Sequence, residues 1–214
     1  MSYSINLPVK KLINQIKKLE NSKIKKTVDL RVREFRKNGK NPNKIFSELC
    51  FCLLTANFNA NGAIKIQNKI GHEFSTLSEK QIAKKLKKLG HRFPNKRAEY
   101  IFLASKQRQN IFNALKTFHG EELRNWIVEN IKGLGYKEAS HFLRNIGFEN
   151  YAIIDFHIID VLVKNKIIKR PKTLTKKKYL EIEKILEIIA GETKLSLGEL
   201  DLYLWYMETN KILK

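Results

Sequence analysis

Apolar residues recur at intervals of three and four along almost the whole chain, whereas strict alternation of apolar and polar residues is scarce. Such spacing places apolar side chains on one face of a helix, so it is typical of α-helices that pack on a core. One clear stripe consists of Ile24, Val28, Val32 and Phe35. The pattern therefore predicts an all-α fold.

Turn and capping residues indicate where several of these helices begin and end. The first stripe stops at Asn38-Gly39, where glycine can adopt the left-handed conformation that closes many helices. The next helix is expected from near Pro42 to about Ala56, and residues 57–62 have the composition of a connection.

Capping boxes predict two further helix starts. The tetrads that begin at Ser78 and Ser196 place a serine three residues before Gln or Glu, an arrangement that satisfies the open N–H groups of a first helical turn. Gly90 is expected to end the first of these helices, and the second is expected to run nearly to Lys214.

The chain has no internal repeat and no linker rich in Gly, Ser or Pro. Any division must therefore lie inside a continuous helical packing. We expect residues 1–214 to form one unit of two interleaved helical lobes, with a seam near residue 58.

Composition indicates a folded protein with a polyanionic partner. Lys and Arg number 42 against 21 Asp and Glu, and the net charge of +21 is too large to serve solubility alone. Hydrophobic residues make up 43% of the chain, which excludes a disordered basic tail. The longest apolar run, from Leu49 to Leu54, is far shorter than the roughly 20 residues that a spanning helix needs. The first residues lack a signal peptide, so a cytoplasmic location without membrane partners is expected.

The cysteine and histidine residues do not have the spacing of a metal site. Cys50 and Cys52 lie in an apolar helical segment, where they point about 200° apart and are expected to be core residues. With two cysteines, a four-cysteine iron–sulfur cluster is excluded, and the five histidines add no zinc pattern.

A very short turn separates two amphipathic helical patterns in the middle of the chain. The first pattern runs from Leu123 to Ile131, and the second from Ala139 to Ile146. Between them lies Lys132-Gly133-Leu134-Gly135, whose backbone N–H groups are expected to stand open at the start of the second helix. Such N–H groups bind phosphate, and Lys132 adds a cation. The segment predicts a phosphate-binding hairpin.

The hairpin and the residues that follow it resemble a known family. Residues 133–139, with Ala152-Ile153-Ile154-Asp155-Phe156-His157 downstream, are similar to the helix-hairpin-helix DNA glycosylases, with the motif at about residues 121–147. The hairpin lacks the proline that is common in that superfamily. Further segments narrow the resemblance to the compact, archaeal-type 8-oxoguanine DNA glycosylase/AP lyases: residues 90–93, 96–100, 140–145 and 200–206.

The resemblance implies a two-lobed helix-hairpin-helix glycosylase that acts as a monomer on double-stranded DNA containing 8-oxoguanine. Such an enzyme flips out the damaged base, excises it through a lysine Schiff base and cleaves the abasic strand by β-elimination. No organic cofactor and no iron–sulfur cluster are implied, although related proteins hold a monovalent cation with hairpin carbonyls. The expected location is cytoplasmic and associated with the nucleoid.

By position in the family motif, Lys137 is the nucleophile and Asp155 the catalytic carboxylate. A neutral amine can attack the sugar C1′, and the helix dipole, the basic surroundings and exclusion of water all favour the neutral form. Asp155 can cap the helix that starts after it, and its negative charge can stabilise the positive charge that develops on the sugar. Without the resemblance, Lys137 would be read as a surface lysine and Asp155 as a structural cap.

The resemblance also implies residues that recognise the base and the backbone. Phe93 and Trp205 match the positions that sandwich the lesion base, and Lys214 matches the terminal lysine that recognises the oxidised base. Lys132, Gly133 and Gly135 are the expected phosphate-binding residues of the hairpin.

Two alternatives remain at this point. The chain could be a glycosylase of the same fold for another lesion base, or a helix-hairpin-helix protein that binds DNA without catalysis and uses Lys137 only to contact phosphate.

Overall fold

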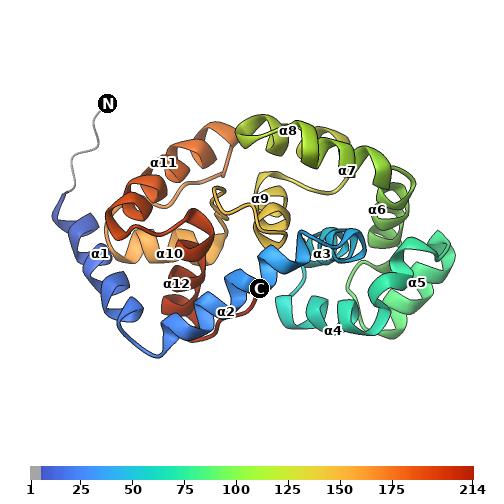
Figure 1. Ribbon diagram of the computed structural model, residues 1–214, viewed down its shortest axis with the longest axis horizontal. Helices are drawn as coiled ribbons and strands as arrows, with labels where there is room; N and C mark the ends of the chain where they lie inside the picture. Colours follow the sequence, from blue (N-terminus) through green and yellow to red (C-terminus); the bar gives the residue numbers. More distant parts are fainter. Residues whose placement is uncertain (1–5) are drawn as a thin grey trace. The chain divides into compact units, whose positions relative to one another are not determined.

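The computed structural model describes residues 6–214, and within this range every regular element is a helix (Figure 1). The all-α prediction is therefore confirmed. The elements are α1 (Leu7–Glu20), α2 (Ile24–Asn38), α3 (Pro42–Thr55), α4 (Ala60–Ile70), the 3₁₀ helix η1 (Gly71–Ser75), α5 (Glu79–Lys88), α6 (Pro94–Lys106), α7 (Arg108–Thr117), α8 (Gly120–Asn130), α9 (Tyr136–Asn145), α10 (Phe156–Lys164), α11 (Lys176–Thr193) and α12 (Leu197–Thr209).

The chain divides into two compact units. Unit 1 consists of the residues up to Arg36 together with Gly147–Lys214, and unit 2 is Lys37–Ile146. The expectation of a seam near residue 58 is wrong, because this residue lies inside unit 2. There α3 packs against α4, and the buried Gln67 amide donates hydrogen bonds of 3.0 Å to the Ser47 carbonyl and to the Glu48 carboxylate.

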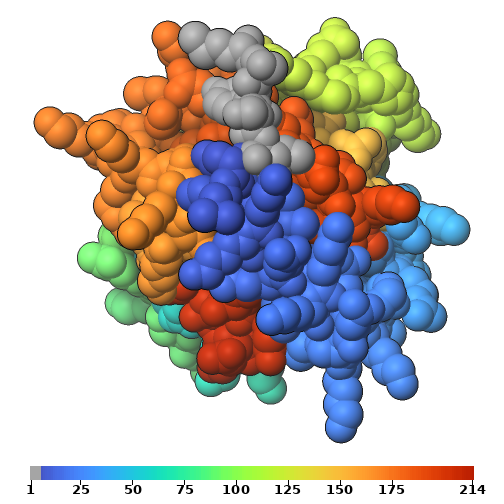
Figure 2. Space-filling model, turned by 90° about the vertical axis from the view of Figure 1, so that its left-hand side faces the viewer, coloured from blue at the N-terminus to red at the C-terminus, as the bar shows by residue number. Residues whose placement is uncertain are grey.

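Unit 1 packs its terminal helices around a common core. Helix α12 contacts α1, α10 and α11, and α1 also contacts α11. The core includes the fully buried rings of Tyr179 and Tyr203. Figure 2 views this unit from the side of α1, with α2 in lighter blue and α12 in red. The exposed face of α2 in this unit carries Lys25, Lys26, Arg33 and Arg36.

Unit 2 is built around α3, which is buried from Phe46 to Thr55 and contacts α4, α6 and α9. Cys50 and Cys52 are both buried and free, as expected for core residues. The predicted connection over residues 57–62 extends too far toward the C-terminus, because α4 already begins at Ala60. Asn59 caps this helix, and its side-chain oxygen accepts a hydrogen bond of 2.7 Å from Gly62 N–H.

Most predicted helix ends agree with the structure. Both capping boxes are formed, at Ser78 with Gln81 and at Ser196 with Glu199. Gly90 follows α5 with a φ of +78°, a conformation that glycine adopts without steric cost. In the described part of the chain, no helix is long and apolar enough to cross a membrane.

Candidate active site and nucleic-acid interface

Helices α8 and α9 pack against each other and are joined by the five residues 131–135. Leu134 N–H donates a hydrogen bond of 3.2 Å to Ile131 O, which closes the turn. The side chains of Ile131 and Leu134 are buried, so the turn is anchored on the core of unit 2 while Lys132 and Gly135 face solvent. The result is a rigid helix-hairpin-helix element.

The hairpin presents the open start of α9 to solvent. Gly135 is the residue before the first turn and has no side chain to cap it, so the N–H dipoles of this turn point outward. Lys132 is exposed and its Nζ lies 2.8 Å from Glu99 Oε1 on α6. Lys96 also lies 2.8 Å from Glu99, and these two hydrogen bonds lower the pKa of the Glu99 carboxyl. A phosphate at this place would meet N–H groups and an amine together.

Lys137 lies in the first turn of α9, directly after the hairpin. Its side chain is 26% exposed, and its Nζ lies 3.6 Å from Glu138 Oε1. The amine is therefore partly accessible to solvent, in the helical turn that follows the hairpin.

A buried arginine contacts side chains on both sides of Lys137. The Arg124 guanidinium lies 5.0 Å from the Tyr136 ring and donates a hydrogen bond of 3.3 Å to Ser140 Oγ. The Tyr136 hydroxyl in turn donates to Asn125 Oδ1. These contacts join α8 to the first turns of α9, so they hold Lys137 in a defined position relative to the hairpin.

Asp155 belongs to unit 1, where it caps α10 as expected from the sequence. Its Oδ1 accepts a hydrogen bond of 3.0 Å from Ile158 N–H. The positive end of the helix dipole stabilises the charged carboxylate there. Asp155 is half-buried, whereas the four residues before it are buried.

Three aromatic rings follow one another beside Asp155 in unit 1. The Phe156 ring lies 3.9 Å from that of His157, and His157 meets Trp205 edge to face at 4.4 Å between ring centroids. Phe156 is 63% exposed, while His157 and Trp205 are half-buried. These contacts connect Trp205 of α12 to the first turn of α10, the helix that Asp155 caps.

Phe93 belongs to unit 2, where it precedes α6 with its ring 39% exposed and the Arg92 guanidinium 5.0 Å from the ring centre. The buried His91 fixes this position. Phe93 N–H donates to His91 Nδ1 at 3.0 Å, so the neutral ring carries its proton on Nε2, which donates to Leu54 O at 3.0 Å. Burial lowers the pKa of His91, which favours this neutral form.

The predicted site residues thus fall into two groups. Four of them lie in the hairpin of unit 2 or in the helical turn after it: Lys132, Gly133, Gly135 and Lys137. Phe93 belongs to the same unit but precedes α6. Asp155, Trp205 and Lys214 belong to unit 1, and Lys214 is half-buried after the end of α12.

Sequence reasoning missed the residues that support this site. It assigned no chemistry to His157 and no role to His91. His91 contacts Leu54, and His157 contacts Trp205; the members of each pair are 37 or more residues apart in the sequence. Local spacing therefore carries no signal of these contacts.

Comparisons with known proteins find similar chains over nearly the whole length. A family described as 8-oxoguanine DNA glycosylase matches residues 28–195. A Korarchaeum cryptofilum protein named 8-oxoguanine DNA glycosylase/AP lyase is 50% identical over 205 residues, which cover 95% of this chain and 98% of that protein. A Methanocaldococcus jannaschii protein of the same name is 52% identical over 206 residues, covering 95% of this chain and 99% of its own.

Solved structures match over nearly the whole chain as well. The crystal structure of the M. jannaschii 8-oxoguanine glycosylase/lyase in complex with 15mer DNA containing 8-oxoguanine gives a TM-score of 0.90 and covers 95% of this chain and 99% of that chain. The crystal structure of the Thermotoga maritima 8-oxoguanine DNA glycosylase, which is 39% identical in sequence, gives a TM-score of 0.89. The match covers 96% of this chain and 100% of that chain.

Proposed function

The chain belongs to the 8-oxoguanine DNA glycosylase/AP lyase family, and on that premise we propose that it excises 8-oxoguanine from duplex DNA through the amine of Lys137. The observation that carries the assignment of Lys137 is its place in the first turn of α9, directly after a hairpin suited to hold the DNA backbone. Reaction of an amine at this place explains both the removal of the base and the cleavage of the strand.

The Lys137 amine starts the reaction with its free electron pair. The pair forms a bond to the sugar C1′, the C1′–N9 bond breaks, and its electrons leave with the base, which takes up a proton. The attacking nitrogen gives up a proton, and its electron pair then breaks the C1′–O4′ bond. O4′ takes up a proton from water, and a protonated Schiff base joins Lys137 to C1′. Loss of a proton from C2′ then expels the 3′ phosphate, which cleaves the strand.

Asp155 supports the first of these steps by its charge. As the C1′–N9 bond lengthens, positive charge develops on the sugar, and a fixed carboxylate lowers the energy of that state. The hydrogen bond from Ile158 N–H orients the Asp155 carboxylate, and a negative charge is favoured at the positive end of the α10 dipole. Lys137 and Asp155 thus have complementary roles, one as nucleophile and the other as electrostatic stabiliser.

The hairpin holds the DNA backbone in this proposal. Lys132 and the N–H groups that follow Gly133 and Gly135 bind phosphate, and no organic cofactor takes part. The carbonyl oxygens of residues 131–135 are of the type that a monovalent cation takes as ligands. Such a cation would add positive charge at the phosphate site.

The damaged base leaves the helix stack before it reacts, at a cost of a few kcal/mol. Phe93 and Trp205 provide flat faces for the extruded base, and Lys214 contributes to recognition of the oxidised base, whose N7–H requires a hydrogen-bond acceptor. Guanine lacks this hydrogen, so the same acceptor would remain unpaired with the normal base. Because the substrate is chromosomal DNA, we also assign the protein a cytoplasmic, nucleoid-associated location.

A panel of matched duplexes, each with one lesion, tests this function. We expect the fastest excision from the 8-oxoguanine duplex, and a covalent protein–DNA adduct when borohydride reduces the Schiff base. Faster excision of another lesion would make the chain a glycosylase of the same fold for that base. Absence of an adduct on every lesion and abasic duplex would leave only a DNA-binding role.

A further inference from the structure

The backbone segment immediately before Asp155 is held by side chains rather than by a strand partner. Residues 151–154 are buried and lie in neither a helix nor a strand. Buried backbone N–H and C=O groups need hydrogen-bond partners, and an extended segment outside a sheet cannot obtain them from a neighbouring strand. Ala152 and Ile154 find their hydrogen-bond partners on helix α11.

Two side chains on one face of α11 supply these hydrogen bonds. The Tyr179 hydroxyl donates to Ala152 O at 2.6 Å and accepts from Ile154 N–H at 3.2 Å. One turn further on, Glu183 Oε1 accepts from Ala152 N–H at 3.0 Å. Tyr179 is 2% exposed and Glu183 is 6% exposed, so solvent does not compete for these bonds.

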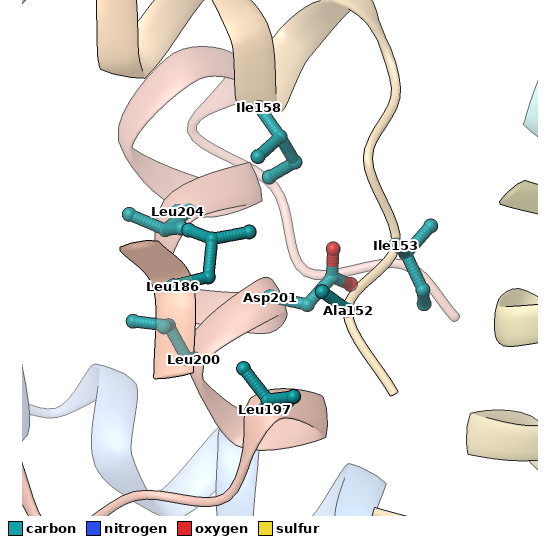
Figure 3. A pocket seen from close by; sticks show the side chains of 8 residues that line it. All are labelled: Ala152, Ile153, Ile158, Leu186, Leu197, Leu200, Asp201 and Leu204. Atoms are coloured by element: carbon teal, nitrogen blue, oxygen red, sulfur yellow. The ribbon is translucent and has the colours of Figure 1, made fainter. Parts of the chain in front are cut away.

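A third polar side chain faces the same segment. Asp201 of α12 is buried, and its carboxylate points toward Ala152 and Ile153 across a small cavity (Figure 3). The other side chains that line this cavity are apolar: Ile158, Leu186, Leu197, Leu200 and Leu204. Polar groups in such surroundings carry a desolvation cost that an apolar core would avoid. Their presence here indicates that they fix the path of the segment.

Asp155 is therefore held from both sides. Before it, the backbone is bound at Ala152 and Ile154 by α11, and after it, its own carboxylate is bound by Ile158 N–H. A carboxylate that stabilises charge must stay within a fraction of an ångström of its working position, because its effect depends on a preset orientation.

We propose that Tyr179 and Glu183 are positioning residues for Asp155. Both side chains are buried, and they act by fixing the backbone from which Asp155 projects. This inference rests on the proposed role of Asp155 in excision.

Substitution of Tyr179 by phenylalanine tests the inference, because it removes the hydroxyl and retains the ring. We expect single-turnover excision of 8-oxoguanine at saturating protein to slow about tenfold, with lesion-duplex affinity within about twofold of the parent. Tyr203→Phe is the matched control, since Tyr203 is also a fully buried tyrosine of unit 1 but makes no hydrogen bond to residues 151–154. It should change the excision rate by less than about twofold.

A double-mutant cycle with Asp155→Asn separates positioning from general damage. If Tyr179 acts through Asp155, Tyr179→Phe will lower the rate by less than about twofold once Asp155 is replaced. Equal fold-losses in both backgrounds, or no loss from Tyr179→Phe alone, would overturn the inference. An Asp155→Asn variant with the parent rate would instead overturn the proposed role of Asp155, and the positioning role with it.

The conservative pair at Glu183 gives an independent check. Glu183→Gln retains an oxygen that can accept from Ala152 N–H, whereas Glu183→Leu does not. Excision should be within about threefold of the parent in the first variant and about tenfold slower in the second. Equal rates in the two variants would contradict a positioning role for this hydrogen bond.

Discussion

Gly133 lies directly against the ring of Tyr100: a Cβ atom on Gly133 would stand 2.2 Å from Cδ2 and 3.0 Å from Cγ of that ring. Gly133 also has a φ of +95°, which side chains other than glycine rarely adopt. The hairpin thus approaches α6 at a distance that no other residue type allows. This contact gives the first glycine of the turn a structural role besides its proposed role in phosphate binding.

Gly133→Ala should therefore lower the free energy of unfolding by about 2 kcal/mol or more, through backbone strain and overlap with Tyr100. Gly135→Ala is the matched control, since a Cβ there would meet only Glu138 Oε2 at 3.5 Å. We expect it to change stability by less than about 1 kcal/mol. Chemical denaturation of both variants measures the difference, and equal stabilities would contradict the close packing of Gly133.

The Glu99–Lys132 pair predicts opposite effects on DNA affinity. Lys132→Gln should weaken binding to damaged and undamaged duplexes by similar factors, because a phosphate contact carries no base information. The slope of log affinity against log salt should become shallower by about 0.9. Glu99→Gln should strengthen binding, because it frees Lys132 from its carboxylate partner. Salt titrations test both variants, and a loss confined to the damaged duplex would contradict the phosphate role.

The buried His91 predicts a loss of stability in mild acid. Burial lowers the pKa of His91 below its ordinary value near 6.5, so the unfolded chain takes up a proton at a higher pH than the folded chain. The free energy of unfolding should fall as the pH drops below about 6.5, until folded His91 is itself protonated. Protonation would also remove the acceptor for Phe93 N–H.

Thermal unfolding of the parent and of His91→Gln between pH 7.5 and pH 5 isolates this contribution, since the other histidines are common to both proteins. The variant should lose less stability over this interval than the parent, even though it is less stable at pH 7.5. Parallel stability curves would show that His91 does not titrate as its burial requires.

The chain end provides a test of base recognition. Deleting Lys214, or adding residues after it, should lower excision of 8-oxoguanine much more than cleavage at a preformed abasic site. In the proposed mechanism, the abasic reaction requires Lys137 and Asp155 but no contact with a base. Equal losses in the two reactions would indicate general destabilisation, and no loss in either would remove Lys214 from the site.

The sequence predicts most helix ends because the responsible contacts are local. The serine boxes at Ser78 and Ser196 and the cap at Asp155 each involve residues three positions apart. The division into units is not local. Its first boundary, after Arg36, falls inside α2, where the apolar stripe of Val28, Val32 and Phe35 shows no break.

The candidate site shows the same contrast. Lys137 and Asp155 stand in a motif that can be read along the chain. Tyr179 and Glu183 cannot be found in this way, because the hydrogen bonds to Ala152 and Ile154 span 25 to 31 residues. Their polar side chains are exceptional only once they are known to be buried.

The central claim is that Lys137 forms the covalent bond to DNA. Borohydride reduction on an 8-oxoguanine duplex, followed by digestion and mass spectrometry of the DNA-linked peptide, locates that bond directly. The DNA remnant should be attached to Lys137, Lys137→Gln should bind the lesion duplex without forming an adduct, and Lys132→Gln should still form it at saturating protein. Attachment to any other amine, or an adduct with Lys137→Gln at the parent rate, would contradict the account.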